Sequence, residues 1–567
     1  MVSSAASISL VEQGDLLRSE AVSASSDPVS AQAHHQFLRI PPFPEVKIFR
    51  FAERPGSEAD PRVVVDAMRR LRVGGAYWAA QAALPSDAVV VRSFGAFDAA
   101  KRLWAERPVI LYDPAGKADV GSPACAIIGE RDPWSMLTHA SAVVPEDDDE
   151  LRLVAALLSV PCYEFEAHSG ELNPSTADVI NMVRDSLCRT TFENPFSGDA
   201  MTPLETVELC GFWRRLIDSN RNFAGGVGFA FWKQKHVAPL LWNGSGQFQF
   251  LRSADRVSTD RAIAVWRSKA PLAVTGELQR RNIPIVEVED GFLRSRGLGA
   301  DCVPPLSITV DRLGPHFDPS RPSELEVLLE QGGFDRPLIE RARKLRRVIV
   351  DAGIGKYERG ITVLDRPAGN RRHILVPGQV EDDRAVQIGG CGLVSNVELL
   401  ARVRENAPDA YILYKPHPDV VAGHRRGAIA DVNSLRFADE IVGELPIASL
   451  IAMVDEVHVN TSLAGFEALM RDKKVTTYGV PFYAGWGLTT DFGPVPNRRT
   501  ARRTIDELVA ATLLLYPRYF DPVTGLPCPA EVVAARLCCT EESHDGFFIG
   551  MRRLQGKLMR RLRSLVQ

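Results

Sequence analysis

Short apolar runs alternate with helix-forming stretches in two consecutive parts of this chain, and no other feature constrains its fold as much. In the first part, strands are predicted at 227–232, 270–275 and 283–291, followed by helices at 322–331 and 336–352. In the second part, strands are predicted at 372–378, 411–415, 439–443, 456–459 and 474–478. Strands and helices in alternation form parallel sheets whose faces the helices cover. The sequence therefore predicts an α/β fold with two Rossmann-type parallel-sheet lobes and a cleft between them.

A chain of 567 residues is too long for one hydrophobic core, so we expect several domains. Residues 43–168 also alternate between strand-like and helical stretches, which predicts a small N-terminal α/β domain without a reactive cluster at its strand ends. The complete predicted division is a disordered arm at 1–42, the small α/β domain at 43–168, a helical connector at 169–209, the two lobes at 210–370 and 371–530, and a C-terminal helix with a basic tail at 531–567.

Composition excludes several classes of protein. The chain is 45% hydrophobic and 24% charged, and no apolar run reaches the roughly 18 residues that a membrane-spanning helix needs. The N-terminus contains acids and lacks the basic start and continuous apolar core of an export signal. The net charge of −4 gives no general attraction to nucleic acid. Nine cysteines without a C-x-x-C pair indicate free thiols in a reducing cytoplasm.

The strand predicted at 283–291 ends in a carboxylate pair, Glu289 and Asp290, and Arg294 and Arg296 follow it. Adjacent residues of a strand face opposite sides, so one carboxylate can act as a base or nucleophile while hydrogen bonds hold the other. Arginines beside the end of a buried strand suit an anionic substrate. An Asp-Gly pair also marks ordinary turns, but the neighbouring arginines favour a catalytic site.

The strand predicted at 411–415 ends in Lys415, and His417 follows between Pro416 and Pro418. The two prolines fix the backbone on both sides of the histidine. A histidine held in this way beside a lysine can donate to a phosphate, although a lone histidine is usually structural. One acidic and one cationic strand end together indicate an enzyme whose two lobes close on a charged substrate.

Two further strand ends in the second part supply polar groups. Gly378 and Gln379 lie at the end of the first of these strands, and Thr461 or Ser462 is predicted to cap a helix after the strand at 456–459. The free amides at the start of that helix suit an anion, and Glu467, one turn inside, is placed to accept ribose hydroxyls. This signal is weak by itself, because every capped helix offers it.

Two segments each keep two interpretations. Phe482, Tyr483 and Trp486 lie among glycines, either in a rim loop that stacks on a base or sugar or in a buried aromatic corner. Residues 546–567 carry six basic residues with leucines at near-helical spacing. They form either an amphipathic helix on an anionic membrane surface or a solvated helix packed on the body.

Several longer strings resemble a known family. VEDGFLRSRGLGAD, LVPGQVEDD, YKPHPDV, TSLAGFEAL and PFYAGWGLTTD follow one another in this order. They are similar to the motifs of the capsule polysaccharide synthesis family KpsC/LipA, and their Glu-Asp-Gly and His-Pro pairs resemble those of bacterial sialyltransferase-like enzymes. The resemblance covers roughly residues 210–525. Members of the family are β-Kdo transferases that build a Kdo linker on a phosphatidylglycerol-type lipid at the inner membrane.

The resemblance implies a two-lobed GT-B-type fold and a retaining transfer of Kdo from CMP-Kdo to a lipid-linked acceptor. Asp290 would be the catalytic carboxylate, with Glu289 and Gly291 completing its motif. Whether Asp290 acts as nucleophile or base stays open. The residues that would bind the CMP part of the donor are His417, Pro418, Thr461 and Ser462.

The resemblance also implies a cytoplasmic protein peripheral to the inner membrane, with CMP-Kdo, a lipid-linked acceptor, and other capsule synthesis or export proteins as its partners. No cofactor and no metal are expected, because Lys415, His417 and a helix start can balance the charge of a departing monophosphate ester. Arg294 or Arg296 is expected to pair with the carboxylate of Kdo.

The sequence departs from the larger members of this family in one respect. Those members carry two transferase modules in tandem, whereas this chain has one complete motif set, closer to the second module, so we expect it to form one linkage. Its N-terminal α/β segment is either a degenerate remnant or an unrelated addition. Two rival functions are a non-catalytic capsule assembly or export factor with a transferase-like shell, and a sugar-nucleotide epimerase or UDP-sugar transferase. Intact Asp290 and His417 argue against the first, and the lack of a diphosphate-binding glycine loop argues against the second.

Overall fold

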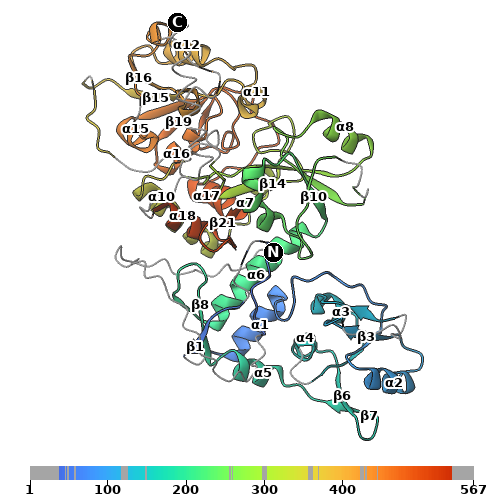
Figure 1. The fold of residues 1–567 in the computed structure, drawn as a ribbon. Helices are drawn as coiled ribbons and strands as arrows, with labels where there is room; N and C mark the ends of the chain where they lie inside the picture. The colour runs from blue at the N-terminus through green and yellow to red at the C-terminus, as the bar shows by residue number, and fades with distance from the viewer. Residues whose placement is uncertain are drawn as a thin grey trace. The chain divides into compact units, whose positions relative to one another are not determined.

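The computed structural model describes residues 37–538 apart from gaps at 45, 47–49, 57–58, 117–124, 147–149, 254–256, 258–259, 296–302, 356–361, 368, 422–424, 426, 428, 430 and 444. Within these ranges the chain forms two compact units (Figure 1). The N-terminal unit contains the described residues up to Arg221 together with Leu241–Gln247. The C-terminal unit contains Asn222–Leu240 and the described residues from Phe248 onward. Both are mixed α/β structures with parallel strands, which confirms the predicted class.

The N-terminal unit is built around a six-stranded sheet with the strand order β4-β3-β2-β5-β6-β7. Its strands are parallel except for β7, which runs antiparallel to β6. A separate antiparallel sheet has the order β1-β8-β9. The elements are β1 (Glu53–Pro55), α1 (Pro61–Leu71), β2 (Val89–Val91), α2 (Phe94–Leu103), β3 (Val109–Asp113), β4 (Ile127–Ile128), α3 (Pro133–Leu137), β5 (Ala142–Val144), α4 (Glu150–Leu158), β6 (Cys162–Glu166), β7 (Glu171–Ser175), α5 (Val179–Ser186), β8 (Thr190–Glu193), β9 (Ala200–Met201) and α6 (Pro203–Asn220).

The structure differs from the predicted boundaries of this unit in two places. Phe37, Leu38 and Ile40 belong to the predicted disordered arm, yet their side chains are buried. Burial of such apolar side chains is favourable by about 1.5–3 kcal/mol each, which ties this segment to the unit. The predicted helical connector contains three strands besides α5, and the compact unit continues through α6 to Arg221. Residues 1–36 of the predicted arm lie outside the described residues.

The first sheet of the C-terminal unit has the strand order β11-β10-β12-β13-β14-β21-β22. Its strands from β11 to β13 are parallel, and those from β13 to β22 pair in antiparallel fashion. The elements around it are β10 (Phe223–Val227), α7 (Phe231–Leu241), β11 (Phe250–Leu251), β12 (Ala262–Val265), α8 (Leu272–Arg280), β13 (Ile285–Asp290), β14 (Ser307–Asp311), α9 (Glu324–Gln331), α10 (Arg336–Asp351), α17 (Ile505–Val509), a π-helical turn (Ala510–Leu515), β21 (Pro517–Phe520), β22 (Pro527–Cys528) and α18 (Ala530–Cys538).

The second sheet of this unit is parallel throughout, with the order β17-β16-β15-β18-β19-β20. Alternate residues of β15, Ile374 and Val376, face the same side and pack with Leu400 and Val403 of α12 in one buried cluster. The elements are β15 (His373–Pro377), α11 (Arg384–Gly389), α12 (Asn396–Asn406), β16 (Tyr411–Lys415), α13 (Pro418–Val421), α14 (Asp431–Ser434), β17 (Glu440–Ile441), α15 (Ile447–Met453), β18 (Glu456–Val459), α16 (Leu463–Met470), β19 (Lys474–Thr477) and β20 (Thr490–Asp491).

Two strands predicted in the first part are wrong. Instead of a strand at 227–232, β10 ends at Val227 and α7 begins at Phe231, because Gly228 adopts a positive φ of 84° that breaks the strand. Instead of a strand at 270–275, α8 begins at Leu272 directly after Pro271, the N-cap residue of that helix. Leu272 is 89% exposed, whereas Val274 packs against a hydrophobic core cluster, so the run is buried on one side only.

The first sheet also differs from a parallel lobe that ends at residue 370. The connection from β13 to β14 contains no helix within its described residues, and β14 returns antiparallel to β13. The chain then leaves the second sheet after β20 and comes back, so that β21 pairs with β14. The predicted second lobe at 371–530 therefore gives its last strands to the first sheet. The predicted C-terminal helix is present as α18, and the basic tail lies outside the described residues.

Candidate functional site

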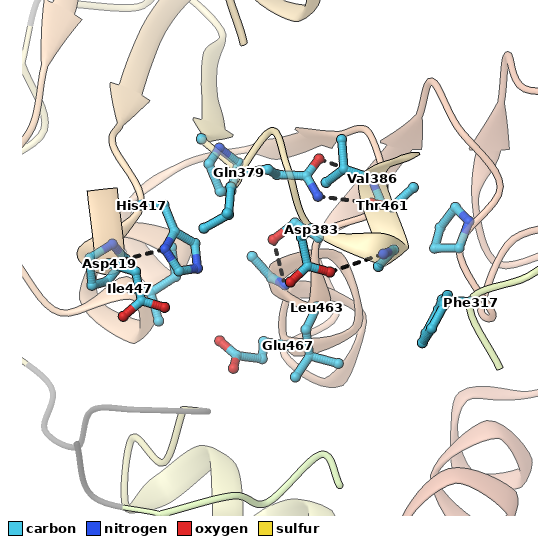
Figure 2. A pocket seen from close by; sticks show the side chains of 18 of the residues that line it. Phe317, Gln379, Asp383, Val386, His417, Asp419, Ile447, Thr461, Leu463 and Glu467 are labelled. Carbon is cyan, nitrogen blue, oxygen red and sulfur yellow. Dashed lines mark hydrogen bonds between the residues drawn. The ribbon is translucent and has the colours of Figure 1, made fainter. Parts of the chain in front are cut away.

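Strands of both sheets in the C-terminal unit end at one cavity of about 220 Å³ (Figure 2). Asp290 is the last residue of β13, whereas Gln379, His417 and Thr461 follow β15, β16 and β18. The carboxyl ends of parallel strands meet at one edge of a sheet, where α/β proteins place their ligands. The predicted site residues that line the cavity are Asp290, Gly378, Gln379, Lys415, His417, Pro418, Thr461, Ser462 and Glu467. Asp290 and His417 thus share one cavity.

Asp290 has a cation beside each of its carboxylate oxygens. Nζ of Lys233 in α7 lies 3.1 Å from Oδ1, and Nε of Arg294 lies 3.1 Å from Oδ2. The Asp290 side chain is 29% exposed, against 10% for Lys233 and 1% for Arg294. Two adjacent cations stabilise the negative charge of a carboxylate. Asp290 therefore presents its carboxylate to the cavity with a buried cation beside each oxygen.

The predicted role of Arg294 as partner of a sugar carboxylate is not compatible with its position. Its side chain is buried, and besides Asp290 it donates to Oγ of Ser295 at 2.6 Å and to the carbonyl oxygen of Val303 at 3.0 Å. All three guanidinium nitrogens thus contact groups inside the protein, and the 1% exposed side chain is not among the described residues that line the cavity. Arg296 lies outside the described residues.

Glu289 does not line the cavity with Asp290, because neighbouring strand residues face opposite sides. Its Oε1 accepts from Nη1 of Arg384 in α11 at 2.6 Å, and Nη2 of the same guanidinium donates to Glu287 at 3.2 Å. Burial raises the pKa of Glu289 to about 7, an effect that Arg384 opposes and Asp290 reinforces. Glu289 is therefore the carboxylate of the pair that hydrogen bonds hold, and it links β13 to α11; a direct catalytic part for Glu289 stays a prediction.

His417 offers a hydrogen-bond donor to the cavity. The backbone N–H of Asp419 donates to Nδ1 of His417 at 3.1 Å, the contact drawn in Figure 2. A neutral imidazole that accepts at Nδ1 carries its hydrogen at Nε2. The ring is therefore prepared to donate from Nε2 to an anionic oxygen.

Lys415 lines the cavity, but its charge is held elsewhere. Its Nζ donates to the carbonyl oxygens of Gly443, at 3.1 Å, and Leu445, at 2.6 Å. The residue is 6% exposed. Lys415 therefore anchors the segment before α15 while it lines the cavity, and its role as a phosphate cation stays a prediction.

Gln379 and Thr461 are joined side chain to side chain. Nε2 of Gln379 donates to Oγ1 of Thr461 at 2.8 Å, and the Thr461 backbone N–H donates to Oε1 of Gln379 at 3.1 Å (Figure 2). Asn396 holds the Gln379 backbone through bonds of 2.8 Å to its N–H and its carbonyl oxygen. Because Oγ1 of Thr461 accepts from Gln379, its own hydrogen remains to be donated to a ligand.

The helix predicted after β18 is α16, and Ser462 is its N-cap, because its side chain accepts from the backbone N–H of Ala464 at 3.3 Å. This confirms the predicted cap. Glu467, one turn inside, lines the cavity and is only 5% exposed. A carboxylate so deeply set suits a neutral hydroxyl ligand better than an anion.

The aromatic segment after β19 forms a buried corner. Tyr483 and Trp486 are fully buried, and the Trp486 indole N–H donates to the carbonyl oxygen of Phe482 at 2.8 Å. Phe482 lines the cavity and packs against Phe292, with ring centroids 4.9 Å apart. The second of the two interpretations is therefore correct.

The structure adds cavity residues that sequence reasoning missed. Asp383 caps α11 and lines the cavity, and His316 and Phe317 reach it from the loop after β14. Asp383 ends the string LVPGQVEDD, so its place beside the strand end of β15 is visible in the sequence. Lys233 had no local signal, because it contacts Asp290 across 57 residues of chain.

Within the described ranges, no helix is long and apolar enough to cross a membrane. In the same ranges, no three His, Cys, Asp or Glu side chains are grouped so that they could hold a metal ion. The described cysteines are free thiols.

The chain has clear relatives. A family model described as "Capsule polysaccharide biosynthesis protein" matches residues 261–519. The capsule polysaccharide modification protein LipA of Neisseria meningitidis is 39% identical over 346 residues, which cover 60% of this chain and 49% of LipA. A solved chain of Thermosulfurimonas dismutans KpsC, described as a beta Kdo 2,4 transferase, is 33% identical with a TM-score of 0.48, covering 56% of this chain and 98% of that chain. A second, described as a beta Kdo 2,7 transferase, is 34% identical with a TM-score of 0.45, covering 55% and 97%.

The chain thus spans about half the length of LipA, and it contains nearly the whole of each KpsC chain at more than 30% sequence identity. The matched family model includes the strand ends that carry Asp290, Gln379, His417 and Thr461. The chain therefore belongs to the capsule polysaccharide synthesis family of KpsC and LipA.

Proposed function

We propose that this chain is a glycosyltransferase that moves Kdo from CMP-Kdo to a lipid-linked, phosphatidylglycerol-type acceptor in capsular polysaccharide linker synthesis, with retention of configuration. The observation that carries the proposal is the cavity that Asp290 enters from the first sheet and His417 from the second. The two KpsC chains described as beta Kdo transferases support it through their sequence identity over nearly their whole length.

The cavity suggests a role for each group. In this proposal, Nε2–H of His417 and the positive end of the α16 helix dipole receive the phosphate of CMP, and positive groups at a departing phosphate stabilise the charge that develops there. Glu467 and Asp383 are placed to accept ribose hydroxyls. Asp290 acts at the anomeric carbon, as nucleophile or as base.

The proposal extends to the arrangement around the site. The two sheets of the C-terminal unit act as the lobes of a GT-B-type enzyme, with the acceptor entering on the first sheet. The enzyme works in the cytoplasm at the surface of the inner membrane, attached through its basic C-terminal tail, and it cooperates with other capsule synthesis or export proteins. The transfer uses no metal, so it proceeds in EDTA.

A direct assay with CMP-Kdo and a Kdo-primed lipid analogue tests the proposal. We expect the wild-type protein to release CMP and Asp290→Ala to lower turnover by a factor on the order of a thousand, with an unchanged circular dichroism spectrum. Asp98→Ala, which removes an exposed aspartate of α2, is the matched control and should keep full turnover. Full turnover in Asp290→Ala would remove Asp290 from its role. A folded wild-type protein that releases no CMP would favour the non-catalytic assembly factor.

A further inference from the structure

We propose that Lys233 positions the Asp290 carboxylate for reaction, a role that rests on the proposed transferase function. Lys233 lies in the first turn of α7, and its Nζ donates to Oδ1 of Asp290 at 3.1 Å. None of the strings that carry the family resemblance contains it. The tertiary structure alone brings it to the end of β13.

Lys233 is held away from water by aromatic rings. Its Nζ lies 3.4 Å from the ring centroid of Trp266 and 5.1 Å from that of Trp232. Trp266 itself is 3% exposed and follows directly on β12, the parallel neighbour of β13. A cation over an indole face and out of solvent interacts more strongly with a nearby carboxylate than a surface lysine does. Solvent therefore screens the attraction between Lys233 and Asp290 less than it screens an ordinary surface ion pair.

Two contacts are needed to fix the orientation of a carboxylate, and Lys233 supplies the second. Arg294 holds Oδ2 through its Nε at 3.1 Å. A single ion pair, between Arg294 and Oδ2, restrains the turning of the Asp290 carboxylate about its last side-chain bond less than two ion pairs do. With Lys233 on Oδ1 as well, both oxygens of the carboxylate are held by cations.

Lys233 acts through Asp290, because Asp290 lines the cavity and neither Lys233 nor Arg294 is among its described lining residues. Burial lowers the pKa of Lys233, and Asp290 opposes this by stabilising the ammonium. The two side chains therefore depend on each other: each is a buried charge whose partner compensates it. Loss of Lys233 is expected to disturb the reacting carboxylate and to leave the donor-binding groups of the second sheet unchanged.

Steady-state kinetics of Lys233→Met tests this role, since methionine keeps the length of the side chain and removes its charge. We expect kcat to fall by a factor on the order of a hundred, while KM for CMP-Kdo stays within about twofold of its wild-type value. The acidic limb of the kcat–pH profile should move to higher pH, because a carboxylate that has lost a cation is protonated more readily. Lys235→Met, an exposed lysine of the same helix, is the matched control and should change neither quantity.

A thermal double-mutant cycle of Lys233→Met, Asp290→Asn and the double variant needs no turnover. We expect the loss of Tm in the double variant to be smaller than the sum of the two single losses, because each single variant leaves either Lys233 or Asp290 without the other. Arg294 loses its carboxylate partner equally in Asp290→Asn and in the double variant, so this loss does not affect the comparison. Lys233→Gln replaces Lys233→Met in both experiments if the methionine variant does not fold. An unchanged kcat and acidic limb, or additive losses of Tm, would overturn the proposal. If the wild-type protein is inactive with CMP-Kdo, the proposed function fails, and the cycle still decides whether the two residues are coupled.

Discussion

Glu289 and Asp290 are neighbours in the chain, yet β13 turns their side chains to opposite faces and gives them different partners. Asp290 enters the cavity between Lys233 and Arg294, whereas Glu289 pairs with Arg384. The reactive member of such a pair is decided by what surrounds each oxygen, which no local sequence pattern records. At the scale of single residues, the pair therefore divides into one group for chemistry and one group for structure.

The raised pKa of Glu289 predicts a pH-dependent stability. Its pKa is about 7 in the folded protein and 4.5 in an unperturbed side chain, so between these values the folded protein holds a proton that the unfolded chain has lost. The resulting stability is complete below about pH 4.5 and is lost as the pH rises through about 7. Between about pH 5.5 and 7.5 we expect the free energy of unfolding of the wild-type protein to fall by roughly 2 kcal/mol relative to Glu289→Gln. Chemical denaturation at both pH values checks this, and parallel curves for the two proteins would contradict it.

Three strands of the second sheet are each followed by a polar residue at the same edge of the sheet. β15, β16 and β18 are adjacent and parallel, so the residues after them, Gln379, His417 and Thr461, meet at one cavity. Side chains then fix the loops: Lys415 anchors the segment before α15, and Asn396 holds Gln379. At the scale of elements, the proposed binding site for the sugar donor thus consists of the ends of three strands. Side chains such as Lys415 and Asn396 hold the loops that follow these strands.

Removal of the His417 imidazole, the hydrogen-bond donor that follows β16, should weaken nucleotide binding. We expect His417→Ala to raise the Kd for CMP about tenfold, the effect of one hydrogen bond to a charged phosphate. Isothermal titration calorimetry measures this directly. His168→Ala, which removes an exposed histidine of the N-terminal unit, is the control. Equal affinities of His417→Ala and the wild-type protein for CMP would contradict the assigned role.

In the C-terminal unit the chain forms most of the first sheet, then the second sheet, and finally returns to add β21 and β22 to the first sheet. β21 pairs with β14, and α18 meets α10 through Arg341, whose Nη2 lies 2.9 Å from Oε2 of Glu531. Glu531 is 7% exposed, so this pair joins residues 190 positions apart inside the protein. At the scale of the whole molecule, the last strands of the first sheet, β21 and β22, follow all strands of the second sheet in the chain.

Breaking this closing pair should destabilise the C-terminal unit. Arg341→Met leaves the buried carboxylate of Glu531 without its cation, which costs about 3–5 kcal/mol of unfolding free energy. The double variant Arg341→Met/Glu531→Met should recover most of that loss, because no buried charge remains unpaired. Arg336→Met, which breaks an exposed pair on the same helix, should leave Tm unchanged. Denaturation curves that do not separate Arg341→Met from Arg336→Met would contradict the expectation.

Local patterns predicted much of this architecture but misplaced some of its parts. The apolar runs that became β13, β15, β16 and β18 were recognised, because strands buried in a parallel sheet are continuous and apolar. The run at 270–275 has a similar composition, but it contains Pro271, the N-cap residue of α8, and Leu272 behind it is exposed, so the run became the start of that helix. Composition over six residues does not separate a buried strand from the first turn of an exposed helix.

The sequence by itself determined the α/β class, the strand ends that carry Asp290 and His417, and the helix cap at Ser462. These properties depend on residues close together in the chain, through the periods of strands and helices and the hydrogen bonds of a cap. Only the tertiary structure decided that Lys233 pairs with Asp290, that Arg384 pairs with Glu289, and that β21 pairs with β14 in the first sheet. Such contacts depend on which distant segments pack together, because the electrostatic environment of a buried charge is set by its neighbours in space.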